Sequence, residues 1–134
     1  MSGTFLRPLL RDAQSSHVIR NTRNGRLLAH QLITAFDSKS RRVGLLRHES
    51  FSEGAAMLIA PSNAVHTFFM RFAIDVAFVT REGLIVKTCA ALKPWRLAAA
   101  FRAFAVVELP SGTLAQNDTV QGDTLSIEPR STMV

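Results

Sequence analysis

The fold of this chain is decided by residues 66–80, which read HTFFMRFAIDVAFVT. From Ile74 to Thr80 the side chains of an extended strand alternate between two faces, and both faces are largely apolar. A strand with one face in water would instead alternate between apolar and polar residues. The pattern therefore predicts a strand that other layers of the protein cover on both sides.

Asp75 is the charged residue within this strand, where it shares a face with Ala77 and Val79. An ionised carboxylate that is buried alone costs several kcal/mol, so we expect it to have a partner. That partner would be an arginine, a histidine, backbone N–H groups or a retained proton. His66 and Arg71 are the nearest candidates in the sequence.

The stretch from His66 to Val76 resembles the core motif of the prokaryotic family known as domain of unknown function 192. That motif runs aromatic-x-Met-(Arg or Lys)-x-x-Pro-(Ile or Leu)-Asp and is followed by a strand, a tight turn and a second strand. The chain departs from it at Ala73, where the family usually has Pro, and at Ser111, where Ala is usual. The further matching segments are Gly44-Leu45-Leu46, Glu82-Gly83, Leu92-Lys93-Pro94-Trp95, Glu108-Leu109-Pro110-Ser111-Gly112 and Gly122-Asp123.

Together these matches cover roughly residues 27–127. The resemblance implies a compact, mostly antiparallel β sandwich, and it brings no known activity.

The remaining elements are predicted from periodicity and turn residues. Extended segments at 16–20 and 26–33 flank Asn24-Gly25, which predicts a β hairpin. Asp37 or Ser38 can cap a short basic helix that runs to about Leu46. Residues 97–104 are rich in alanine and are interpreted as one or two helical turns, and residues 113–117 as a single turn. Further strands are expected at 56–60, 84–92, 105–109 and 124–128.

Short strands separated by frequent Gly and Pro turns favour an all-β architecture over a βαβ fold. We expect a compact antiparallel β sandwich or squat barrel, jelly-roll-like, with one or two short helices. Residues 1–15 show no periodicity and are expected to form a loose N-terminal arm. Residues 16–134 would form a single β-rich domain.

Composition narrows the class of protein. With 47% hydrophobic and 19% charged residues, the chain is globular rather than disordered. The single cysteine, Cys89, excludes an internal disulfide, and we interpret it as a core residue rather than a reactive thiol. No apolar run approaches the roughly 18 residues of a membrane span. The first residues lack the pattern of a signal peptide, so we expect a cytoplasmic protein.

The net charge of +6 is concentrated in the first part of the chain, since residues 1–50 hold nine of the 16 Lys and Arg residues against three acidic ones. Such a bias would attract anionic partners. Few aromatic residues are interleaved with these charges, so we favour a solvated basic face over a nucleic-acid site. Arg41 and Arg42 on the basic helix are possible contacts for an anion, although a solvated face is again the favoured interpretation.

Two acidic residues in apolar strands, Asp75 and Glu108, are the most informative polar features. If the strands approach each other, the carboxylates and His66 could share a proton, hold a cation or perform acid and base catalysis. The favoured interpretation is that each carboxylate accepts backbone N–H groups and fixes the sheet register. The histidine spacings match no zinc motif, and phosphate-binding, dinucleotide-binding and Gly-x-Ser-x-Gly motifs are absent. No metal or cofactor is therefore predicted.

Three functional hypotheses follow. The first is a non-catalytic binding or accessory module with a polar cleft for a small molecule or a protein partner. The second is a small hydrolase or lyase that uses Asp75 and Glu108 with His66. The third is an accessory protein of a surface or pilus machine. The ligand, oligomeric state and pathway stay open. The cleft candidates are His66, Met70, Arg71, Asp75, Trp95 and Glu108.

Overall fold

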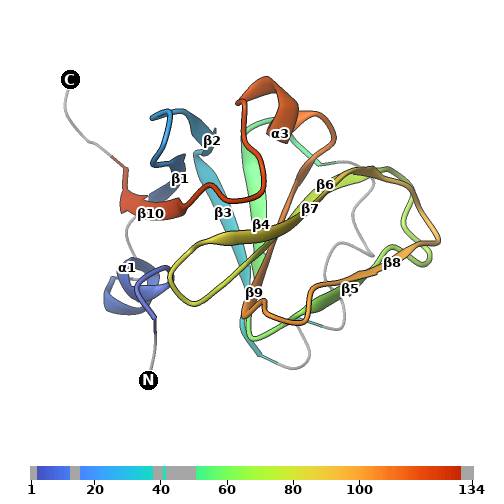
Figure 1. The fold of residues 1–134 in the computed structure, drawn as a ribbon, viewed down its shortest axis with the longest axis horizontal. Helices are drawn as coiled ribbons and strands as arrows, with labels where there is room; N and C mark the ends of the chain where they lie inside the picture. The colour runs from blue at the N-terminus through green and yellow to red at the C-terminus, as the bar shows by residue number, and fades with distance from the viewer. Residues whose placement is uncertain (1–2, 13–15, 38–40, 42–50, 131–134) are drawn as a thin grey trace.

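The computed structural model describes residues 3–12, 16–37, 41 and 51–130. In these ranges short strands dominate and the two helices are each about one turn long (Figure 1). The elements are α1 (Arg7–Arg11), β1 (His17–Asn21), β2 (Leu27–Ala29), β3 (Gln31–Ala35), β4 (Ala55–Ile59), β5 (Ala64–His66), β6 (Ile74–Val79), β7 (Ile85–Leu92), β8 (Leu97–Ala99), β9 (Ala105–Pro110), α3 (Thr113–Gln116) and β10 (Leu125–Pro129).

The strands form three sheets. The central sheet has five strands in the order β3-β4-β9-β6-β7, and it lies beside a three-stranded sheet, β10-β1-β2, and a two-stranded sheet, β5-β8. Within the described residues this confirms the predicted β-rich, sandwich-like fold with one or two short helices. The pairing of β3 with β4 is parallel and the other pairs of described strands are antiparallel, so the sandwich is mostly antiparallel. Parallel neighbours need a crossover of a dozen or more residues, and residues 36–54 supply that length.

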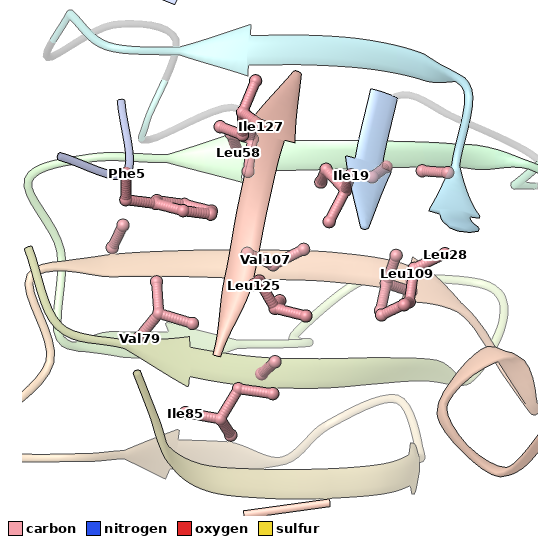
Figure 2. Packing of buried hydrophobic residues seen from close by; sticks show 14 of the residues in the cluster. Phe5, Ile19, Leu28, Leu58, Val79, Ile85, Val107, Leu109, Leu125 and Ile127 are labelled. Carbon is pink, nitrogen blue, oxygen red and sulfur yellow. The ribbon is translucent and has the colours of Figure 1, made fainter. Parts of the chain in front are cut away.

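Strand β6 is buried along its whole length, as its two apolar faces predicted. On one face Ala77 and Val79 belong to a first hydrophobic core between the central sheet and the three-stranded sheet. Figure 2 shows this core, which joins Ile19 and Leu125 of the outer strands to Val107 of the central sheet. Burial of apolar surface on this face contributes roughly 25 cal/mol per Å².

The opposite face of β6 contributes Ile74, Val76 and Phe78 to a second hydrophobic core. Val65 of β5 and Ala98 of β8 belong to the same cluster, so the two-stranded sheet covers this face. The central sheet is thus the middle of three layers, which explains why its strands read as continuous apolar runs.

The predicted loose arm at residues 1–15 needs correction for its described part. Residues 7–11 form α1, and Phe5, Leu6 and Leu9 are buried in the first core. The N–H of Phe5 also donates a hydrogen bond to the carbonyl of Arg81 at 3.0 Å. A single helical turn is too short to show periodicity in the sequence, so burial rather than helix propensity stabilises this segment.

Two other expectations also change. The alanine-rich segment at 97–104 begins with strand β8, which pairs with β5, and is not helical. The extended segment at 26–33 divides into β2 and β3 because the N–H groups of His30 and Gln31 both donate to the carbonyl of Gly54, at 2.8 and 3.2 Å.

The basic helix predicted from residue 37 to residue 46 lies mostly outside the described residues. Within them, the N–H of Arg41 donates to the carbonyl of Asp37 at 3.0 Å.

The structure confirms several other predicted elements, which are the hairpins β1-β2 and β6-β7, the inner strand β9 and the turn α3. None of the described helices has the length and apolar character that a membrane crossing requires.

Candidate functional site

Thr67 joins the two loops that precede β6 and β8. Its hydroxyl donates to the carbonyl of Lys93 at 2.6 Å and accepts the N–H of Arg96 at 2.8 Å. Its backbone N–H donates to the carbonyl of Arg96 at 2.8 Å, and its carbonyl accepts the N–H of Trp95 at 3.0 Å. Because Thr67 is itself fully buried, it fixes both loops against the second core.

These loops and the neighbouring β5 carry four aromatic side chains that contact one another, which we call the aromatic cluster: His66, Phe68, Phe69 and Trp95. The ring centroids of His66 and Phe68 are 5.1 Å apart, those of Phe68 and Trp95 are 6.0 Å apart, and those of Phe69 and Trp95 are 4.6 Å apart. Phe69 is 70% exposed and Trp95 is 56% exposed. Exposed Leu97 extends the same loop region along β8. Large apolar side chains thus gather on the surface here.

The backbone at two members of the aromatic cluster is left-handed. The φ angles are 68° at Phe69 and 66° at Trp95. Residues with a Cβ rarely adopt this conformation, which costs roughly 1–3 kcal/mol each and concentrates at functional sites. The rings of Phe69 and Trp95 are exposed, so burial in the core does not offset the free-energy cost of this backbone conformation.

Cations lie beside the aromatic cluster in the sequence. Residues 61–73 and 84–104 contain no acidic residue, although together they include five cations. Arg71, Lys93 and Arg96 adjoin the cluster in the sequence and are exposed. We call these three residues the basic rim. The segments that carry the exposed rings therefore also carry exposed cations.

The buried carboxylate of Asp75 accepts hydrogen bonds from backbone amides. It is 1% exposed, and its Oδ1 atom accepts the N–H of Ala91 at 2.8 Å while Oδ2 accepts the N–H of Leu114 at 2.9 Å. These two donors belong to the end of β7 and to α3. The carboxylate therefore ties two separate elements to β6 through backbone amides.

Unlike Asp75, Glu108 has a buried carboxyl oxygen without a hydrogen-bond partner among the described residues. It is 3% exposed, and its strand neighbours are Met57 on β4 and Val76 on β6, both in the second core. Within the described part of the chain, its Oε1 atom has no hydrogen-bond partner. Burial raises the pKa of this carboxyl to about 8. Glu108 is therefore mostly protonated at neutral pH.

Asp75 and Glu108 lie on opposite faces of the central sheet. In the β6-β9 register Asp75 pairs with Leu109, whereas Glu108 pairs with Val76. Paired residues point to the same face and successive residues to opposite faces, so Asp75 faces the first core and Glu108 the second. The hypothesis that these carboxylates act together with His66 is therefore wrong in its geometry.

The other predicted site residues divide as follows. Trp95 and His66 lie within the aromatic cluster, whereas Met70 is buried in the second core. The Nη1 atom of Arg41 donates to the carbonyls of Phe36 at 2.7 Å and Ala60 at 3.4 Å. The other predicted anion contact, Arg42, lies outside the described residues. The six cleft candidates are thus not gathered in one polar cleft.

No group of three or more His, Cys, Asp or Glu side chains is placed to hold a metal ion within the ranges that the structure describes. Cys89 is half-buried and packs against the second core. The surface feature that remains is the aromatic cluster with its basic rim.

Thr67, Phe68 and Phe69 were not among the residues selected from the sequence. Their alternation resembled that of a buried strand, and the left-handed turn that directs Phe69 outward leaves no mark in residue types. One signal was available, since no acidic residue lies between Pro61 and Ala73 and two phenylalanines follow each other. A strand with both rings buried would have the same sequence.

Comparison with known families matches residues 19–127 to the domain of unknown function 192, described as Uncharacterized ACR. No curated protein matches the chain. A Sinorhizobium meliloti 1021 protein described as a candidate transcription regulator has a similar crystal structure, with a TM-score of 0.72 and 18% identity over 84% of this chain and 92% of that one. A protein of unknown function from Novosphingobium aromaticivorans DSM 12444 gives a TM-score of 0.71 and 18% identity over 83% of each chain. At this identity the likeness supports the fold alone.

Proposed function

Because the chain belongs to the domain of unknown function 192 family, which brings no activity, we propose from the geometry that it is a non-catalytic binding module. Its recognition surface is the aromatic cluster with the basic rim. Its partner is a protein that presents apolar side chains within an acidic surface. The observation that carries the proposal is the outward exposure of Phe69 and Trp95 on left-handed turns.

Residue types at the surface support a protein partner. Trp and Arg supply much of the energy at protein interfaces, and aromatic residues are enriched at interface cores. A contiguous group of exposed rings is unusual on a surface that only contacts water. The basic rim would speed association with an acidic partner and suppress wrong pairings.

The arrangement of the rings favours protein over single-stranded nucleic acid. Base stacking needs ring faces that are free to receive successive bases. Here the rings of Phe69 and Trp95 are tilted by 59° and contact each other, and those of Phe68 and Trp95 are stacked at 29°. The rings thus form one apolar patch, which suits a complementary side chain.

The test compares the parent chain with Phe69→Ala and Trp95→Ala as baits in quantitative capture from cells, followed by binding with the purified candidate. Phe101→Ala is the matched control, because Phe101 is 95% exposed and makes no ring contact with the cluster. We expect one acidic protein to be retained by the parent and the control and lost from both cluster variants. Such a partner from a surface or pilus machine would establish the accessory role. Equal retention on all four baits, or binding only of an oligonucleotide, would contradict the proposal.

A further inference from the structure

A cavity of about 770 Å³ lies between α1, the start of β1 and strand β3. In Figure 1 α1 and β10 lie at one end of the molecule, and β5 and β8, which adjoin the aromatic cluster, lie at the other. The cavity is thus separate from the proposed recognition surface. Its volume is within the range of about 300–1,000 Å³ that is usual for small-molecule sites.

Four nitrogen-bearing side chains line the cavity among the described residues: His17, His30, Gln31 and Arg130. His17 is only 5% exposed, and its imidazole makes no hydrogen bond to any residue that the structure describes. It lies on the same face of β1 as buried Ile19, so it is directed inward. Its nitrogen atoms are not among the fully buried atoms that lack a partner, so a molecule in the cavity can reach them.

The position of His30 is supported by Gly54. A Cβ atom on residue 54 would lie 2.2 Å from Nε2 of His30, so only glycine leaves room for this ring. Gly54 also has a φ of 83°, and its carbonyl holds the backbone N–H groups where β2 ends and β3 begins. The imidazole therefore packs against the turn that separates the two strands, where His30 lines both this cavity and a second pocket that includes Glu53 and Gly54.

The rest of the lining sets the chemistry of an occupant. Arg130 carries a permanent positive charge, and none of the described residues that line the cavity is acidic. The apolar part of the lining includes Leu9, Leu32 and Phe36. A molecule that suits both parts of this lining has an anionic head and an apolar body.

We propose that this cavity is a binding site for a small organic anion. Its carboxylate or phosphate head would accept hydrogen bonds from His17 and Arg130, and its body would lie on Leu9, Leu32 and Phe36. The head would supply the acceptor that His17 lacks among the described residues. The site is independent of the proposed recognition surface, so either proposal can fail without the other.

The test uses the full chain with four probes: hexanoate, hexyl phosphate, hexanol and inorganic phosphate. Isothermal titration calorimetry gives affinities, and amide NMR shifts locate the site. We expect saturable binding of hexanoate or hexyl phosphate, with shifts at His17, His30 and Leu32. The better anion should bind at least about tenfold more tightly than hexanol, because hexanol lacks the charge. Which of the two anions binds more tightly identifies the head group.

Substitutions distinguish binding in the cavity from a general effect of positive charge. Arg130→Gln and His17→Gln should each weaken the binding of the tighter-binding anion by about tenfold. Arg11→Gln is the control, because Arg11 is an exposed cation on α1 that does not line the cavity. Should His17→Gln fail to fold, exposed Arg130 still provides the test. No saturable binding, equal binding of hexanol and both anions, or equal effects of Arg130→Gln and Arg11→Gln would overturn the proposal.

Discussion

The carboxyl of Glu108 makes the stability of this protein depend on pH. Its pKa in the folded chain is about 8, above the ordinary value of 4.5, because burial disfavours the charged form. The folded state therefore binds the proton more tightly than the unfolded state. The resulting stabilisation is complete below about pH 4.5 and is lost as the pH rises through 8.

Replacing this carboxyl with an amide tests that dependence. Glu108→Gln should remove the fall in the free energy of unfolding between pH 5 and pH 8. At pH 8 it should be more stable than the parent by on the order of 3 kcal/mol. Urea unfolding at pH 5, 6.5 and 8 provides the measurement, with exposed Glu82→Gln as the control. Parallel pH profiles for the parent and Glu108→Gln would contradict this account.

For Asp75 we predict the opposite result: replacing its carboxylate with an amide should lower the free energy of unfolding. Both of its oxygens accept backbone N–H groups, so Asp75→Asn places an NH₂ group against a donor. We expect a loss of about 1–3 kcal/mol in the free energy of unfolding at pH 7. Thermal or urea unfolding measures it. A variant as stable as the parent would instead indicate a carboxylate retained for function at a cost to stability.

At this scale the sequence predicted part of the chemistry. The apolar setting of Asp75 indicated a buried carboxylate, and backbone donors were the favoured partners. The isolation of Glu108 could not be predicted, because alternation assigns a residue to a face without saying what covers that face. The exposure of Phe69 likewise depends on a backbone φ angle rather than on residue type.

Among the loops, the hydrogen bonds of Thr67 are predicted to hold the aromatic cluster in place. Thr67→Val keeps the shape of the side chain but removes its bonds to Lys93 and Arg96. We expect faster amide exchange at Trp95 and Arg96 and a loss of about 1–3 kcal/mol in stability. Partner binding should weaken although every aromatic ring is present. Thr88→Val on β7 is the control, and unchanged exchange at Trp95 would refute the role of Thr67.

The turn after β1 is held by an ion pair between exposed Arg23 and buried Asp123, which was not predicted. Asp123 accepts hydrogen bonds from Nε of Arg23 at 2.6 Å and from the side-chain amide of Asn21 at 2.9 Å. The Arg23 guanidinium, aided by backbone and amide donors, holds the pKa of Asp123 well below its ordinary value. Its stabilisation is therefore present above pH 3.8 and is lost as the pH falls.

Asp123→Asn should accordingly lower the free energy of unfolding by about 1–3 kcal/mol at pH 7. The difference from the parent should shrink as the pH falls below 4. Asp118→Asn is the matched control, because its exposed carboxylate lies 3.6 Å from the same guanidinium and should contribute at most about 1 kcal/mol. Equal effects of the two substitutions would show that burial of Asp123 does not matter.

Element types were predictable where a turn signal and a periodicity agreed, as in the hairpins β1-β2 and β6-β7. They were not predictable for β8, because three residues in an alanine-rich segment favour a helix until β5 pairs with them. The break between β2 and β3 at His30 could not be predicted from the sequence either, because it depends on hydrogen bonds to the carbonyl of Gly54, which is distant in the sequence.

For the whole molecule, three layers follow from one sequence property, which is that the central strands are apolar on both faces. The parallel β3-β4 pair could not be deduced in this way, because strand direction depends on the path of the intervening chain. The layered arrangement leaves two ends with different surfaces. One carries the aromatic cluster and the other carries the cavity beside α1.

The central claim is that the aromatic cluster recognises a protein partner. The most direct test is the dissociation constant of the purified partner for the parent, Phe69→Ala, Trp95→Ala and Phe101→Ala chains. We predict that each cluster variant weakens binding by at least about tenfold, and that Phe101→Ala stays within about twofold of the parent. Equal dissociation constants for all four chains would contradict the claim.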